Sequence, residues 1–254
     1  LAALLFVNYA QRSFIYFPDT APPPAGLASG FDGQIVKINV GEIGELSSLY
    51  APPPNTSAPV ILFFHGNGGS AWQRIAQFES FKSWGVGFLA AEYPGYGGNA
   101  GSPSEEAIFE TALANYDWLT RQGIAPENII IYGNSLGSAS AVYVAANRDA
   151  GGLILTAPFT SALAMGQRSM KVLPVSLFMK DKFRSDLLMA NVEEPLLIIH
   201  GTADQVVPFE MGGKLLALHT GESAFVSIPG GQHYMWNTDM PKHIRKAVAA
   251  FTAK

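Results

Sequence analysis

The stretch Gly133-Asn134-Ser135-Leu136-Gly137 decides how this chain of 254 residues is read. It follows an apolar run at residues 128–132 and precedes small residues with helical character at 138–147. A G-x-S-x-G pentapeptide between a strand and a helix predicts a nucleophile elbow, a strained turn that presents the serine. The two glycines are needed because side chains there would collide with the neighbouring strand and helix. The serine then lies at the positive end of a helix, which stabilises the negative charge of acyl transfer.

Composition limits the classes of protein that fit this chain. Hydrophobic residues make up 48% and charged residues 14%, which favours one large globular domain over a disordered chain. The formal net charge is −4, and Lys and Arg form no cluster in the sequence, which argues against nucleic acid as a partner. The absence of cysteine excludes disulfides, thiolate zinc sites and a cysteine nucleophile.

Apolar runs alternate with helical stretches along most of the chain. The pattern predicts strands at residues 31–40, 45–50, 60–64, 86–91, 128–132, 152–156, 195–200 and 224–228. It predicts helices at residues 71–84, 136–148, 209–219 and 240–252, and one from the capping box Ser102-Pro103-Ser104-Glu105 to Arg121. Repeated βα units predict an α/β fold with a mostly parallel central sheet and helices on both faces.

The serine needs a base within hydrogen-bonding reach and a carboxylate that orients this base. We assign the base to His233, because it lies in a glycine-rich loop just after the last predicted strand. His65 and His200 each end an apolar strand before a glycine, which favours a structural role in a turn. His219 and His243 fall on predicted helices, where a solvated surface position is expected.

The acid is expected between the serine and the histidine, because nucleophile-elbow enzymes use the chain order Ser, Asp or Glu, His. Asp204 fits this order and follows the predicted strand that ends at residue 200. Asp181 and Asp186 are rivals, but they lie in a charged segment that we interpret as a surface excursion. We therefore predict Ser135, Asp204 and His233 as the catalytic residues.

A second glycine-rich turn, His65-Gly66-Asn67-Gly68-Gly69, directly follows the predicted strand at residues 60–64. The tetrahedral oxyanion of acyl transfer needs two preorganised N–H donors. We predict that these are the backbone N–H groups of Leu136 and Asn67, with Gly68 as the second choice in this turn. The chemistry requires no metal and no organic cofactor.

The same turn has a competing interpretation. Gly66-x-Gly68-x-x-Ala71 satisfies a dinucleotide-binding pattern, and Glu92 ends the next strand at about the expected distance. Two predicted strands precede the turn, whereas this fingerprint normally opens its domain, and the chain has no Tyr-x-x-x-Lys pair. We therefore rank an NAD-dependent oxidoreductase below a hydrolase.

Together these motifs resemble the α/β-hydrolase superfamily, and within it the Bem46-like branch of serine hydrolases. The turn at residues 65–69 matches the branch's oxyanion loop, and residues 157–161 and 200–208 also fit. Residues 92–97 resemble a segment usually written Asp-Tyr-Arg-Gly-Tyr-Gly, with Glu92 and Pro94 in place of the acid and the arginine. The resemblance implies an α/β-hydrolase fold, with a minimal lid inserted at about residues 161–194.

We divide the chain into an N-terminal segment, residues 1–18, and an α/β-hydrolase domain, residues 19–254. The apolar run Leu1–Val7 is far shorter than the ~20 residues of a membrane helix. Two interpretations stay open: an ordinary helix end or cloning remnant, and the tail of a longer signal or anchor segment. Residues 11–18 resemble the segment after the branch's membrane anchor, which implies membrane association through this end. The sequence assigns neither a compartment nor an oligomeric state.

We predict a serine carboxylesterase that acts on a small-molecule ester through an acyl-enzyme. The short lid segment should leave the site open, which favours short to medium acyl chains. A thioesterase, a protein deacylase or a peptidase would use the same residues. A non-catalytic binding module ranks lower, because such proteins often lose a triad member and all three are present here.

Overall fold

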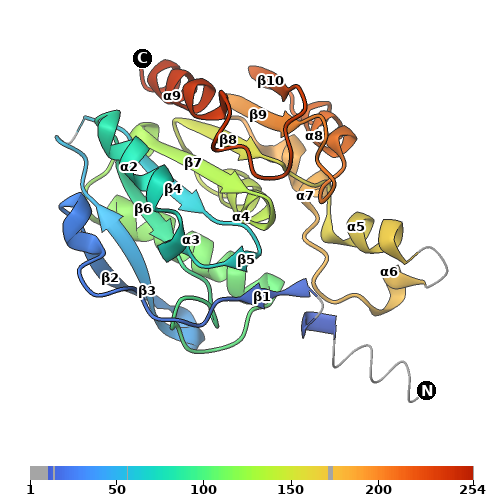
Figure 1. Cartoon of the computed structure of the whole chain (residues 1–254), viewed down its shortest axis with the longest axis horizontal. Helices are drawn as coiled ribbons and strands as arrows, with labels where there is room; N and C mark the ends of the chain where they lie inside the picture. Colours follow the sequence, from blue (N-terminus) through green and yellow to red (C-terminus); the bar gives the residue numbers. More distant parts are fainter. Residues whose placement is uncertain (1–10, 14, 56, 171–173, 254) are drawn as a thin grey trace.

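An eight-stranded sheet forms the centre of the computed structural model, which describes residues 11–13, 15–55, 57–170 and 174–253 (Figure 1). In spatial order the strands are β10 (Ser223–Ile228), β9 (Leu196–Gly201), β8 (Gly152–Thr156), β7 (Ile129–Asn134), β4 (Val60–Phe64), β6 (Gly87–Ala91), β3 (Gly44–Ala51) and β2 (Gln34–Val40). The six strands from β10 to β6 are parallel, whereas β3 is antiparallel to β6 and β2 to β3. The predicted mostly parallel sheet is confirmed.

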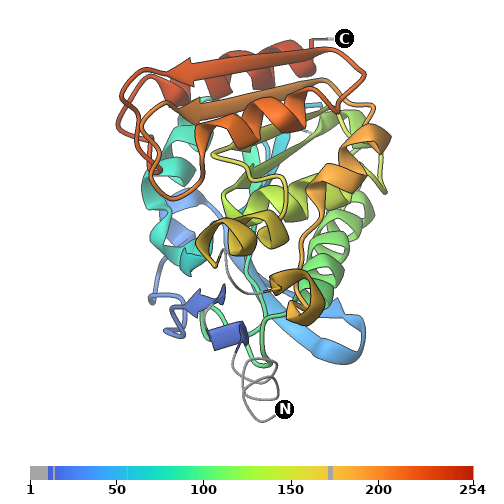
Figure 2. The same ribbon diagram turned by 90° about the vertical axis from the view of Figure 1, so that its right-hand side faces the viewer.

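Helices cover both faces of this sheet (Figures 1 and 2). The α-helices are α2 (Ile75–Ser83), α3 (Glu105–Arg121), α4 (Leu136–Ala145), α5 (Ala162–Ser169), α6 (Val175–Phe178), α7 (Ser185–Leu188), α8 (Phe209–Leu216) and α9 (Met240–Phe251). The 3₁₀ turns are η1 (Ala28–Phe31), η2 (Gly41–Ile43), η3 (Ala71–Gln73), η4 (Pro126–Asn128) and η5 (Met189–Asn191).

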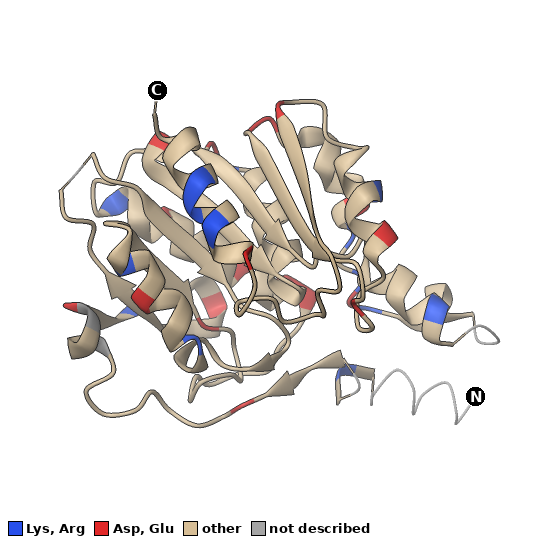
Figure 3. Cartoon of the chain, turned by 45° about the horizontal axis from the view of Figure 1, so that its top comes forward, with Lys and Arg blue, Asp and Glu red and all other residues tan. Residues whose placement is uncertain are grey.

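Successive residues of the central strands pack into two separate hydrophobic clusters, one on each face of the sheet. Leu62 of β4 packs in a cluster with apolar residues of α3, α4 and α8, whereas Phe63 packs in a second cluster with residues of α2 and α9. All five residues of β4 are buried, as expected for a parallel strand covered on both sides. Helix α9 buries Ile244 and Val248, whereas its Lys and Arg residues, blue in Figure 3, are exposed. The predicted helices on both faces are therefore confirmed.

The ends of several elements differ from the predictions. Ser104 caps α3 in place of Ser102, because the Ser104 Oγ accepts the Ala107 N–H at 3.1 Å. The predicted helix at residues 71–84 is divided into η3 and α2. Two short strands, β1 (Phe17–Pro18) and β5 (Gly68–Gly69), were not predicted; they pair in parallel beside the main sheet (Figure 1).

Two side chains expected at the surface are buried. Asp181, between α6 and α7, is 3% exposed, and its carboxylate accepts hydrogen bonds from Arg12 Nε and the Tyr16 hydroxyl, both at 3.0 Å. The interpretation of Asp181 as part of a surface excursion was wrong, because it anchors the start of the described chain. His219 follows α8 and its Nε2 lies 3.0 Å from the Glu194 carbonyl, so it is a packed residue and not a solvated one.

The interpretation of Leu1–Val7 concerns residues outside the described part of the chain. Among the described helices, none has the length and apolar character needed to cross a bilayer.

We expect Gly137→Ala to destabilise the fold strongly. A Cβ at Gly137 would lie 2.6 Å from the His65 carbonyl oxygen and still closer to that of Phe64, so the sheet and α4 would have to separate. Overpacking of this kind costs about 2 kcal/mol or more, which urea unfolding measures directly.

The control is Gly213→Ala on the exposed side of α8, where an added Cβ meets nothing within 4 Å. That variant should be as stable as the wild type or gain about 0.5–1 kcal/mol, because alanine favours a helix interior over glycine. Equal stability of the two variants would contradict the close-approach argument for Gly137.

Candidate active site

Ser135 occupies a strained turn between β7 and α4. Its φ of 52° and ψ of −116° are unusual for a residue with a side chain. The turn is held on both sides, because the Ser135 N–H donates to the Thr156 carbonyl at 3.0 Å and its own carbonyl accepts the Ser138 N–H at 2.9 Å. The strand and helix approach closely here, and a Cβ at Gly133 would lie 2.6 Å from the Ser138 Cα. This is the geometry of a nucleophile elbow.

Three side chains from three loops form a chain of hydrogen bonds at the carboxyl edge of the sheet. His233 Nε2 lies 3.0 Å from the Ser135 Oγ, and His233 Nδ1 lies 2.8 Å from the Asp204 Oδ2. The carboxylate can only accept, so we assign the ring proton to Nδ1, which leaves Nε2 to accept from the serine hydroxyl. The structure thus brings together the three residues that the sequence selected, and this arrangement can activate a serine.

The electrostatics of Asp204 suit a permanent carboxylate. Its side chain is fully buried, and Oδ1 accepts the N–H groups of Val206 at 2.8 Å and Val207 at 2.9 Å. Burial by itself raises the pKa of Asp204, but hydrogen bonds from His200, His233 and the Val207 N–H outweigh it and hold the pKa below its ordinary value. Asp204 is therefore charged at neutral pH and can stabilise a protonated His233.

The two segments that carry the predicted oxyanion donors adjoin the serine. Leu136 is the first residue of α4, and the first N–H groups of a helix have no partner in their own helix. Asn67 belongs to the loop after β4, which is the strand next to β7. A Cβ at Gly66 would lie 3.4 Å from the Ser135 Cβ, so this loop runs against the nucleophile. The assignment of the Asn67 and Leu136 N–H groups stays a prediction.

The side chain of Asn67 ties the glycine-rich loop at residues 65–69 to the start of the described chain. Its Oδ1 accepts the Phe17 N–H at 3.3 Å and the Tyr96 hydroxyl at 2.9 Å, and its Nδ2 donates to the Ile15 carbonyl. Pairing of β1 with β5 adds a second attachment. The sequence does not predict this strap, residues 15–18, because it joins positions about fifty residues apart and no local pattern marks it.

The buried pair of His65 and Glu92 also supports the loop at residues 65–69. His65 Nε2 lies 2.7 Å from the Glu92 Oε1, and the Glu92 Oε2 accepts the Ala71 N–H at 2.7 Å. Both side chains are completely buried. Glu92 is therefore occupied inside the protein, and β1 covers the glycines of the turn, which leaves the dinucleotide interpretation without its acidic ligand.

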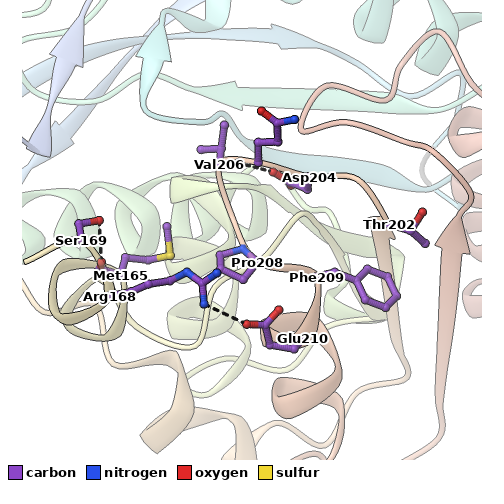
Figure 4. A pocket seen from close by; sticks show the side chains of 10 residues that line it. Met165, Arg168, Ser169, Thr202, Asp204, Val206, Pro208, Phe209 and Glu210 are labelled. Atoms are coloured by element: carbon purple, nitrogen blue, oxygen red, sulfur yellow. Dashed lines mark hydrogen bonds and ion pairs between the residues drawn. The ribbon is translucent and has the colours of Figure 1, made fainter. Parts of the chain in front are cut away.

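A polar cavity lies next to the acid of this site (Figure 4). Its volume is about 440 Å³, and it is lined by residues of α5, of the loop at 202–206 and of the start of α8. Arg168 and Glu210 face each other there at 3.3 Å. Ser135 and His233 are not among its lining residues, so we do not assign it to the reacting part of a substrate. The described residues include no His, Cys, Asp and Glu cluster suited to a metal ion.

The sequence of this chain is similar to those of known proteins. The model of a family described as "Alpha/beta hydrolase family" matches residues 61–191. An uncharacterized protein of Mycobacterium tuberculosis, Rv2307c, is 32% identical over 232 residues, which cover 91% of this chain and 83% of that protein. A lysophosphatidylserine lipase of Danio rerio, ABHD12, is 33% identical over 187 residues, 64% of this chain and 48% of that protein.

A similar fold also occurs in a solved structure. The esterase Pf2001 of Pyrococcus furiosus matches 94% of this chain and 96% of its own with a TM-score of 0.68 and 18% identity. At that identity the likeness concerns the fold alone.

We expect the Ser135 Oγ to react covalently with a fluorophosphonate reagent, because its hydroxyl bonds to an oriented imidazole. His233→Ala should lower the labelling rate at least about a thousandfold, since the base is lost. Mass spectrometry of the labelled peptide gives the site, and time courses give the rate.

His243→Ala is the matched control, since it removes a half-buried histidine of α9 and should label at the wild-type rate. Labelling at another serine, or equal rates in the two histidine variants, would refute the assignment.

Proposed function

The chain belongs to the alpha/beta hydrolase family, and we propose that it is a serine hydrolase that cleaves carboxylic esters through an acyl-enzyme. Family membership confirms the resemblance seen in the sequence. The observation that carries the proposal is the unbroken chain of hydrogen bonds from Ser135 through His233 to Asp204. The relative from Danio rerio, which is named a lipase, supports ester cleavage as the chemistry.

Acylation follows from the direction of these hydrogen bonds. The Ser135 Oγ attacks the ester carbonyl while His233 Nε2 takes its proton, and the carbonyl π electrons move to the oxygen. Asp204 stabilises the imidazolium at Nδ1, and the N–H groups of Leu136 and Asn67 receive the oxyanion. The intermediate then collapses, the C–O bond to the alcohol breaks, and Nε2 returns the proton to the leaving oxygen. Ser135 remains as an ester of the acid.

Deacylation repeats these steps with water. His233 Nε2 removes a proton from a water molecule, which attacks the acyl carbon of the Ser135 ester. The second tetrahedral intermediate uses the same oxyanion donors, and the proton on Nε2 passes to the Ser135 Oγ. Free acid and the original hydroxyl result, so the cycle balances without a cofactor.

Exposed apolar side chains support a substrate with an apolar acyl group. Val206 stands two residues after Asp204 and Tyr234 directly after His233, and each is 56% exposed. Between Thr160 and Pro195 the described residues form only the short helices α5 to α7 and η5. A segment of this size is too small to enclose a long lipid chain, which favours short to medium acyl esters.

We expect hydrolysis of p-nitrophenyl esters with an optimum at short to medium acyl chains. Ser135→Ala should lower kcat by about 10⁴-fold or more, and Asp204→Asn by about 10⁴-fold through the wrong histidine tautomer. Initial rates from acetate to palmitate measure both quantities.

A Ser135→Ala, His233→Ala double variant should be no slower than either single variant, because the residues act as one unit. Additive losses would count against the triad. Rates that rise steadily with acyl length and jump at an oil–water interface would refute the predicted size preference. A folded wild type without activity on any ester would refute the proposed function.

Asn67→Ala tests whether the strap positions the oxyanion loop. The variant keeps the backbone N–H but loses the contacts to residues 15–17 and to Tyr96, so kcat should fall about tenfold with little change in KM. Asn147→Ala is the control, because its side chain is exposed just after α4 and donates to the Tyr143 carbonyl. Wild-type kcat in both variants would show that the loop holds its place without the strap.

A further inference from the structure

Asp204 is approached by a second imidazole, that of His200, which the reaction sequence above does not use. His200 lies in β9 and is completely buried, four residues before Asp204. Its Nε2 lies 3.4 Å from the Asp204 Oδ2, the same oxygen that His233 Nδ1 contacts at 2.8 Å. Oδ1 is engaged by two backbone N–H groups. Both oxygens of the acid are therefore held, and the His200 ring lies beside the oxygen that His233 contacts.

The surroundings of the His200 ring assign its proton. Nε2 faces two acceptors, the Asp204 Oδ2 and the Val207 carbonyl at 3.1 Å. On the opposite side Nδ1 has no hydrogen-bond partner among the described residues, and a Cβ at Gly212 of α8 would lie 2.8 Å from it. A proton on Nδ1 would be buried and unsatisfied, so we place the single ring proton on Nε2. The Nε2–H then donates to the Val207 carbonyl at 3.1 Å and presents its positive edge to the Asp204 Oδ2 at 3.4 Å.

The packing holds this ring in one orientation. Phe209 of α8 meets it edge-on, with ring centroids 5.6 Å apart. Glu210 of α8 pairs with the exposed Arg168 of α5 at 3.3 Å. The titratable groups that face His200 from the described elements are thus Asp204, and His233 through it.

We propose that His200 is a positioning residue of the triad: its Nε2–H holds the loop of Asp204 through the Val207 carbonyl and, from 3.4 Å, limits the charge that the carboxylate presents to His233. The inference rests on the proposed function, because it concerns the acid of that site. His200 does not touch the reacting atoms and acts only through Asp204. The His200 ring beside Oδ2 also helps to hold the pKa of Asp204 below its ordinary value, against the opposing effect of burial.

Electrostatics gives the direction in which the acid limb of the kcat/KM profile moves when His200 is replaced. A donor on Oδ2 withdraws negative charge from the side that faces His233 Nδ1. Without this donor the His233 imidazolium is more strongly stabilised, so the acid limb of the kcat/KM profile moves to higher pH. The carboxylate also gains freedom to rotate, which lowers the fraction of productive His233 orientations.

The test compares His200→Leu with His200→Gln in the whole chain. Glutamine carries an N–H donor the same number of bonds from Cα as His Nε2, whereas leucine has none. We expect His200→Leu to lower kcat by about tenfold with KM nearly unchanged and to move the acid limb upward, while His200→Gln stays close to the wild type. Thermal melting establishes that both variants are folded.

Two results would overturn the proposal. A folded His200→Leu with wild-type kcat and an unchanged acid limb would show that the ring only fills space. Equal losses in the leucine and glutamine variants would show that ring packing matters and the donor does not. If His200→Leu fails to fold, His200→Gln is compared with His200→Asn, whose amide nitrogen is one bond closer to Cα than His Nε2. Equal kcat and an equal acid limb in these two variants would then overturn the proposal.

A second readout separates this proposal from the proposed function. NMR of the ¹⁵N-labelled histidine rings should show the Nε2–H form of His200 in the wild type. The His233 Nδ1–H resonance should shift in His200→Leu and keep its position in His200→Gln. A wild type that neither cleaves esters nor reacts with a fluorophosphonate would refute the proposed function, whereas an Nδ1–H form of His200 would refute this inference alone.

Discussion

The strained backbone at Ser135 is the constraint on which the rest of the site depends. A φ of 52° at a residue with a side chain costs of order 1–3 kcal/mol and persists only where the surroundings impose it. Here β7 holds one side of the turn and the almost fully buried helix α4 holds the other. Gly133 and Gly137 permit this contact because neither carries a Cβ. Relaxation of the turn would carry the Ser135 Oγ away from His233.

The parallel sheet brings the other residues of the site to this strained turn. Strands β4, β7, β9 and β10 run in the same direction, so the loops that follow them meet at one edge. Those loops supply Asn67, Ser135, Asp204 and His233. The supports are buried behind them, as the Glu92 contact with His65 and the His200 contact with Asp204 illustrate. Glu92 thus supports the loop of Asn67 through His65, and His200 lies against Asp204.

Local patterns predicted what depends on neighbours in the chain. Continuous apolar runs predicted the parallel strands, and the G-x-S-x-G setting predicted the turn at Ser135. The prediction of a surface position for Asp181 failed because its partners, Arg12 and Tyr16, lie more than 160 residues away. The strap at residues 15–18 and its partner Asn67 are likewise far apart in the sequence. No periodicity in the sequence records a contact over such a separation.

The sequence by itself determined the order of the strands and helices along the chain, the family, and the residue types of a serine-based site, because these follow from periodicity, glycine placement and motif order. Only the tertiary structure decided which groups meet. It placed His200 beside the oxygen that His233 contacts and paired residues 17–18 with the turn at residues 68–69. The physical reason is that hydrogen bonds between distant segments exist only once the sheet has brought those segments to one edge.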